Sequence, residues 1–189
     1  MRGPLAHARP PESTSDDAPR ANLEEAGVRE FLAFAVGTET FALPLSCVRE
    51  IMRVPAVTPV PRAPREILGI VSVRGQVTTL IDLRVRLSVA VGPISSRTRV
   101  LLVDQGDEIL GLLCDRVLQV HRLSETEVEI ASVLGVDASS YVMGIGRPGQ
   151  RKPDAQRDEQ EGHSPAATSD ADVLILLDPI ALLKRQGHA

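Results

Sequence analysis

The stretch ILGIVSVRGQVTTLIDL, residues 67–83, decides the expected fold. It contains two runs rich in Val, Ile and Thr on either side of Arg74-Gly75, a pattern that predicts a strand, a tight turn and a second strand. An arginine at the tip of a hairpin has no packing role, and arginine is enriched at interface hot spots. Arg74 is therefore the leading candidate for contact with a partner.

The stretch REFLAFAVGTETFALPL, residues 29–45, predicts a second hairpin, which turns at Gly37-Thr38-Glu39. After Pro44, the residues Leu45, Val48, Ile51 and Met52 recur at helical spacing, so a short amphipathic helix is expected over 44–52. On such a helix Val48 and Ile51 share one face, and Glu50 points elsewhere.

The chain repeats itself in degenerate form. Placing Gly37 on Gly106 aligns apolar positions of the first hairpin with those of RVLLVDQGDEILGLL, residues 99–113. In the same way Gly69 corresponds to Gly144, and Asp82 to Asp178. An internally duplicated chain of many short strands predicts an all-β fold with a few short helices, in which two small barrels share an apolar seam. Short helical turns are expected at Pro64–Ile67, at the capping box Ser124–Glu127 and after Asp178-Pro179.

The stretch GIGRPG at 144–149 matches the G-x-G-x-x-G spacing of dinucleotide-binding sites. Such a site needs a helix directly after the glycines, and here a polar stretch without apolar periodicity follows. The duplication instead makes the segment the rim of a hairpin with a polar loop insert at about 147–171. Its glycines then serve backbone geometry at the end of a strand.

Composition narrows the functional classes. The 189 residues have a net charge of -4, no Trp, one Tyr and three Phe, which gives neither the basic field nor the stacking surface that nucleic-acid binding requires. Residues 1–27 lack periodicity and are expected to form a disordered arm without an apolar targeting segment, so the chain is expected to be cytoplasmic. Cys47 and Cys114 are expected to be buried thiols, and neither their spacing nor that of the histidines suggests a metal site.

The segment GIVSVRGQVTTLIDLR at 69–84 resembles the strand-turn-strand motif of the CheW family, the adaptor proteins that couple chemoreceptors to the histidine kinase CheA. That motif is usually written as an N-L-R-G turn followed by P-I-V-D-L, and the Asn-Leu of the family is Ser72-Val73 here. Five further blocks follow in the family order, so the resemblance covers nearly all of residues 29–185: EFLAFAVGTETFALPLSCVREIM, VTPVPRAPREILG, TRVLLVDQGDEILGLLCDRV, YVMGIG and VLILLDPIALL.

The resemblance implies a fold of two intertwined, five-stranded SH3-like barrels within residues 28–186. The first barrel would span about 40–95 and the second about 98–177, with their first strands exchanged. It also implies a scaffold without catalytic residues, cofactor or metal, which binds the regulatory domain of a CheA-type kinase and the tip of methyl-accepting chemoreceptors. The partner-binding residues carried over by position are Val48, Glu50, Ile51, Arg74 and Gly75.

The residues themselves leave alternatives open. Glu50 and Arg74 either contact a partner or form an internal ion pair, and Val48 either belongs to the interface or packs in the core. Arg84 and Arg86 are expected to be solvated, with a role only at a rim. The alternative function within the adaptor class is a chemosensory-like pathway for surface motility or gene regulation; more distant ones are a nucleic-acid-binding SH3-like module and an NAD-binding enzyme.

Overall fold

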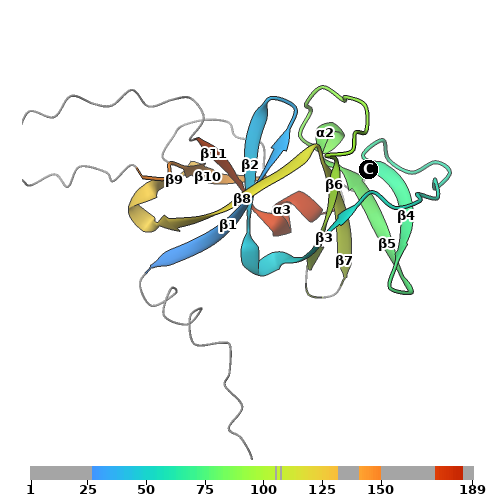
Figure 1. The fold of residues 1–189 in the computed structure, drawn as a ribbon, viewed down its shortest axis with the longest axis horizontal. Helices are drawn as coiled ribbons and strands as arrows, with labels where there is room; N and C mark the ends of the chain where they lie inside the picture. The colour runs from blue at the N-terminus through green and yellow to red at the C-terminus, as the bar shows by residue number, and fades with distance from the viewer. Residues whose placement is uncertain (1–26, 105, 107, 132–140, 150–172, 185–189) are drawn as a thin grey trace, which may run out of the picture.

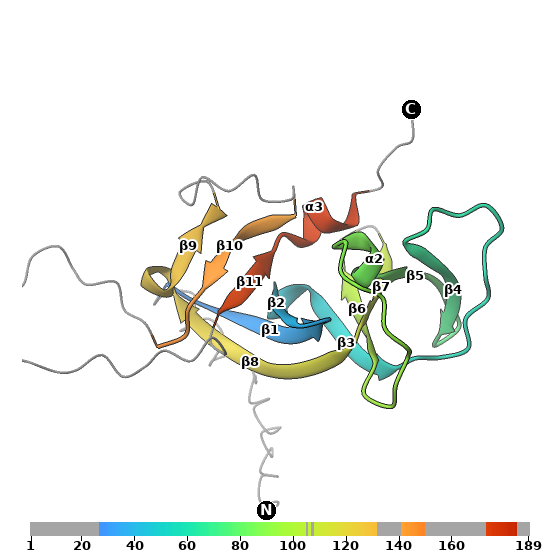
Figure 2. The same cartoon turned by 90° about the horizontal axis from the view of Figure 1, so that it is seen from above.

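The computed structural model describes residues 27–104, 106, 108–131, 141–149 and 173–184, which form two β-sheets and a few short helices (Figures 1 and 2). This confirms the expected mostly-β fold. The predicted N-terminal arm and most of the predicted loop insert lie outside the described residues. The boundaries proposed for the two barrels remain predictions.

The first sheet has five strands in the order β3-β6-β7-β5-β4. The strands are β3 (Val48–Arg53), β4 (Ile67–Val73), β5 (Gln76–Asp82), β6 (Arg99–Asp104) and β7 (Ile109–Cys114). The hairpin that the Arg74-Gly75 turn predicts is present, with β4 antiparallel to β5. Strand β5 then runs parallel to β7, and Leu80 lies opposite Gly111.

The second sheet has six strands in the order β8-β1-β2-β11-β10-β9. The strands are β1 (Val28–Val36), β2 (Glu39–Pro44), β8 (Arg116–Ser124), β9 (Val128–Ile130), β10 (Val142–Gly146) and β11 (Leu174–Leu177). Here β11 runs parallel to β2, as β5 does to β7 in the first sheet, and Leu176 lies opposite Ala42. The three-residue β9 makes the sixth strand; in the five-stranded sheet only the isolated bridge between Thr58 and Ile70 corresponds to it.

The two halves of the chain exchange hairpins. The first hairpin, β1–β2, joins β8 to β11 of the second half, and the second hairpin, β6–β7, joins β3 to β5 of the first half. Short helices end each half: α2 (Leu83–Arg86) starts at the N-cap Asp82, and α3 (Pro179–Leu183) starts at the N-cap Asp178. The duplication inferred from the sequence is therefore a duplication of structure, and neither sheet is complete without strands of the other half.

The core lies both within and between the sheets. One cluster joins Phe34 of β1 and Leu177 of β11 to Leu101 of β6 and Leu112 of β7, and Leu182 of α3 is buried with them. In Figure 1 helix α3 lies between the two sheets. A second cluster belongs to the six-stranded sheet and a third to the five-stranded sheet. Because the largest cluster is shared, burial of apolar surface holds the sheets together as well as each sheet in itself.

The prediction of a helix over 44–52 is wrong. A single 3-10 turn, η1 (Leu45–Cys47), is followed directly by strand β3. Burial in β3 alternates along the strand, so Val48 and Glu50 are half-buried and Ile51 is exposed; the expected pairing of Val48 with Ile51 on one helical face is therefore also wrong. The apolar residues fit a helical period over this short window, but hydrogen bonding of β3 to β6 decides the structure.

The GIGRPG segment ends strand β10 in an antiparallel hairpin with β11, as the duplication predicts. Glycine is needed at position 144 because a Cβ atom there would collide with the backbone carbonyl oxygen of Glu129 on β9. At position 146 a Cβ atom would lie 2.6 Å from Leu123. Close packing of strands thus accounts for two glycines of the triplet. The expected capping box is also present: Glu127 Oε2 accepts hydrogen bonds from the N–H and the hydroxyl of Ser124 in η2 (Glu125–Glu127).

Candidate partner-binding site

The candidate site is centred on the turn between β4 and β5. Both turn residues have positive φ, 51° for Arg74 and 83° for Gly75, as a type I′ hairpin turn requires. Glycine adopts this conformation without cost, whereas arginine is there at a steric cost. The Arg74 guanidinium lies 3.0 Å from the Glu50 carboxylate of β3, with side-chain exposures of 80% and 35%. The ion pair within the chain is therefore formed, and most of the arginine still faces solvent.

The structure separates the other residues expected at the site. Val48 packs against the core that the two sheets share, so ordinary core packing accounts for it. Ile51 is 44% exposed on the opposite face of β3 from Glu50. Arg74 and Gly75 of the β4–β5 turn thus lie beside Glu50 of β3, and Ile51 adds an exposed apolar side chain on β3, an edge strand of the same sheet.

One exposed apolar residue next to the turn was missed by the sequence reasoning. Val77 is the second residue of β5, and its side chain is 72% exposed. An open hollow of about 380 Å³ begins there and reaches the β6–β7 hairpin, lined by Arg49, Gln76, Val77, Thr78, Thr79, Asp104, Gly106, Glu108 and Ile109. The sequence signal was its place two residues past the turn glycine, between the polar Gln76 and Thr78.

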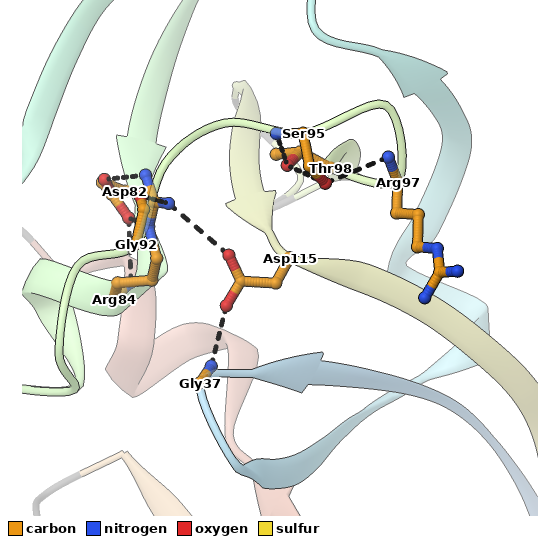
Figure 3. Close-up of polar contacts among 8 residues, drawn as sticks. All are labelled: Gly37, Asp82, Arg84, Gly92, Ser95, Arg97, Thr98 and Asp115. Atoms are coloured by element: carbon orange, nitrogen blue, oxygen red, sulfur yellow. Dashed lines mark hydrogen bonds and ion pairs between the residues drawn. The ribbon is translucent and has the colours of Figure 1, made fainter.

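Arg84 lies in the interior, which corrects the expectation that it is solvated. Its side chain is 3% exposed, and it donates two hydrogen bonds to Asp82, from Nε to Oδ1 at 2.9 Å and from Nη2 to Oδ2 at 2.7 Å. Nη1 donates to the carbonyl of Gly92 at 2.7 Å and lies 3.5 Å from Oδ1 of Asp115 (Figure 3). Hydrogen bonding to Asp82 raises the pKa of Arg84, so the guanidinium stays charged although it is buried.

Asp115 extends this network into the other sheet. Its Oδ2 accepts a hydrogen bond of 2.7 Å from the backbone N–H of Gly37, at the β1–β2 turn (Figure 3). Arg84, Asp82 and Asp115 therefore connect the end of β5 and the β7–β8 junction to the first hairpin. The ion-pair network serves the junction of the two sheets and is not a rim contact.

Arg86 is also buried, again in contrast to the expectation. Its side chain is 4% exposed and donates to Glu66 Oε1 at 2.6 Å, to the carbonyl of Leu182 at 3.1 Å and to the carbonyl of Lys184 at 2.6 Å. The guanidinium also lies 5.3 Å from the centre of the Tyr141 ring. Because free carbonyls end every helix, Arg86 satisfies those at the end of α3 and holds that helix against the first half of the chain.

The side chains that could ligate a metal ion are not gathered at one place among the described residues. No group of three or more His, Cys, Asp or Glu side chains among them is placed to hold a metal ion. Burial raises the pKa of Cys114 to about 12 and that of Cys47 to about 11, so both remain protonated thiols near neutral pH. No helix in the described part of the chain is long and apolar enough to cross a membrane.

The molecule thus consists of two interlocked β-sheets, with a charged turn at the tip of one hairpin and exposed apolar side chains on the same sheet. The model of the CheW-like domain matches residues 30–187, and the chain belongs to this family. It is therefore a non-catalytic scaffold protein of chemotaxis signalling.

Individual relatives agree with this assignment. The chain is 31% identical to the chemotaxis protein CheW of Helicobacter pylori over 66% of its own length and 75% of that protein. It is also 31% identical to the protein FrzA of Myxococcus xanthus over 62% of its length and 73% of that protein. The crystal structure of the scaffolding protein TtCheW from Thermoanaerobacter tengcongensis has the same fold: the TM-score is 0.67 at 22% identity, over 85% of this chain and 95% of the other.

Proposed function

We propose that this chain couples methyl-accepting chemoreceptors to a CheA-type histidine kinase, by binding the regulatory domain of the kinase and the cytoplasmic tip of the receptors. It does so in the cytoplasm, at receptor arrays, without a cofactor and without inserting into the membrane. The observation that carries the proposal is the Arg74 side chain, which is 80% exposed at the tip of the β4–β5 turn. Glu50, Gly75 and Ile51 complete the proposed contact surface, with Val48 supporting β3 from the core side.

The physical argument rests on preorganisation. The ion pair with Glu50 limits the conformations of the long Arg74 side chain before any partner arrives, which lowers the entropy lost on binding. Val77, two residues beyond the turn glycine, and Ile51 of β3 offer exposed apolar surface on the same sheet. An arginine beside apolar side chains is a common composition for the centre of a protein interface.

The test is calorimetric titration of the full chain with the kinase regulatory domain, and separately with a receptor cytoplasmic fragment, both from the same cell. The variant Arg74→Glu places a second negative charge beside Glu50 and removes the positive charge that the proposal assigns to the partner contact. We therefore expect affinity for at least one partner to fall by about tenfold or more. A matched control is Arg122→Glu, since Arg122 also forms an exposed ion pair of 3.0 Å, with Glu30 of the other sheet.

Binding by the wild type that survives Arg74→Glu, or that falls equally in Arg122→Glu, would show that the turn is not the contact. If the wild type binds neither partner while folded, the coupling function itself is wrong. Repeating the titration with each CheA-type kinase of the cell also tells flagellar chemotaxis from a pathway of surface motility or gene regulation, because the partner defines the pathway.

A further inference from the structure

A basic surface lies at the opposite end of β3 from Val48. Arg53 ends β3, and it lies directly across the ladder from Arg99, the first residue of β6. Residues opposite each other in an antiparallel pair point to the same face, and like charges in this arrangement destabilise the sheet. The cross-strand pair Arg53 and Arg99 is therefore unfavourable for the isolated chain.

The turn before β6 adds a third positive charge. Ser95 and Thr98 close this turn, with a hydrogen bond of 2.9 Å from Ser95 N–H to Thr98 Oγ1. Arg99 Nη1 donates to the carbonyls of Ser96 and Thr98 at 2.7 and 2.8 Å, which fixes that side chain. Arg97 is exposed, and Figure 3 shows its side chain extending away from the turn.

These three arginines have no carboxylate within ion-pair distance among the described residues, although other charges on β3 are neutralised. Arg49 pairs with Asp104, and Glu50 pairs with Arg74. The chain as a whole carries a net charge of -4, so three neighbouring cations without acidic partners stand out from its average. We call Arg53, Arg97 and Arg99 the basic surface.

We propose that the basic surface binds an acidic segment of the protein that docks on β3. Continuity with Ile51, part of the proposed contact surface, supports this occupant. Ile51 lies opposite Leu101, and Arg53 opposite Arg99, so Ile51 and the two arginines share the face of β3 that Glu50 does not occupy. The exposed Ile51 then takes an apolar side chain of the partner, and carboxylates of the same segment neutralise the arginines. Desolvated charge-assisted hydrogen bonds to guanidinium give such a segment its specificity.

This inference rests on the proposed function and specifies the chemistry of the partner. The experiment compares Arg53→Ser with Arg116→Ser in the full chain, using the kinase domain and the receptor fragment as probes over about 50 to about 300 mM NaCl. Arg116 is the matched control, since it is an exposed arginine without a described ion pair and lies at the start of β8 in the other sheet. Arg53→Lys keeps the charge and serves as the rescue variant.

We expect Arg53→Ser to weaken one partner roughly three- to tenfold at low salt and to flatten the salt dependence of its affinity, with a further loss in Arg53→Ser/Arg99→Ser. Arg116→Ser should change that affinity by less than about twofold. Arg53→Lys should keep the salt dependence but lose part of the affinity, because lysine keeps the charge without the guanidinium fork. Thermal melting of each variant establishes that it is folded.

Two results would overturn the inference while the proposed function stands. One is a wild type that binds its partner with an affinity and a salt dependence that Arg53→Ser leaves unchanged. The other is a wild type that binds duplex DNA or anionic vesicles, together with an Arg53→Ser variant that no longer does so but keeps its affinity for the partner protein. That result would assign the surface to another class of ligand. A folded wild type that binds neither protein would defeat the coupling function and, with it, this inference.

Discussion

Arg74 and Arg84 lie just beyond the two ends of the same strand, β5, and their surroundings are opposite. Each arginine has a carboxylate partner, Glu50 for Arg74 and Asp82 for Arg84, but the side-chain exposures are 80% and 3%. Water and salt screen the first pair, so it stabilises the fold little and its guanidinium remains available to a partner. The second pair has lost its hydration and depends on its hydrogen bonds within the protein. Within one hairpin and its flanks, one arginine is available for binding and the other is part of the structure.

The largest effect that tests the comparison of Arg74 with Arg84 is expected at Arg84, the buried arginine after β5. Replacing Arg84→Met keeps much of the side-chain volume but leaves Asp82 buried without its cation, and the carbonyl of Gly92 loses its donor. We expect the free energy of unfolding to fall by about 3 to 5 kcal/mol, the range for breaking one partner out of a buried ion pair. Urea denaturation followed by circular dichroism measures this loss.

A double variant separates the charge from the packing. If the uncompensated Asp82 carboxylate causes the loss, Asp82→Asn/Arg84→Met should regain part of the stability lost in Arg84→Met, because the buried negative charge is removed. An Arg84→Met protein as stable as wild type would mean that the two ends of β5 do not differ energetically.

The second test concerns Arg86, the other buried arginine. Arg86→Met removes the donors of the Leu182 and Lys184 carbonyls at the end of α3 and the cation beside Glu66, which is itself partly exposed. We expect a loss of about 2 to 3 kcal/mol, smaller than for Arg84 because water can reach Glu66 and rehydrate it. Hydrogen exchange of α3 should be faster in Arg86→Met than in the wild type, and this acceleration should exceed that of the strands. Equal protection of α3 in variant and wild type would show that Arg86 does not hold this helix.

Local sequence patterns were sufficient for much of the fold. The Arg74-Gly75 and Gly37-Thr38-Glu39 turns were predictable because a turn depends on a few adjacent residues, and the duplication because both halves keep the same apolar spacing. Strand β3 was not predictable in this way. The apolar spacing over residues 44–52 suits a helix, and only pairing with the distant strand β6 makes residues 48–53 a strand. Backbone pairing across the exchanged halves is information that no short window of sequence contains.

Of the three arginines around β5, only the exposed one was placed correctly from the sequence. Arg74 could be recognised by its place at a turn. The burial of the other two arginines depends on contacts that are more distant in sequence, since Arg84 also reaches Asp115, and Arg86 reaches Leu182 across 96 positions. One signal existed in the duplication itself. Aligning Asp82 with Asp178 places Arg86 on Leu182, which is fully buried, so a buried environment for Arg86 follows from its apolar counterpart in the other half.

The last test addresses the exposed end, where the expected effect on stability is smallest. Arg74 has a φ of 51°, a conformation that asparagine tolerates better than arginine. Arg74→Asn should therefore relieve part of the backbone cost while it removes the ion pair with Glu50, and exposed pairs contribute only about 0 to 1 kcal/mol. The two changes oppose each other, so the unfolding free energy should stay within about 0.5 kcal/mol of wild type in urea denaturation. A loss above about 1.5 kcal/mol would place Arg74 with Arg84 as a structural residue, because a screened surface pair is too weak to account for it. Unchanged stability together with weaker binding in the calorimetric titration would instead separate the two arginines fully, since fold and recognition would then depend on opposite ends of one strand.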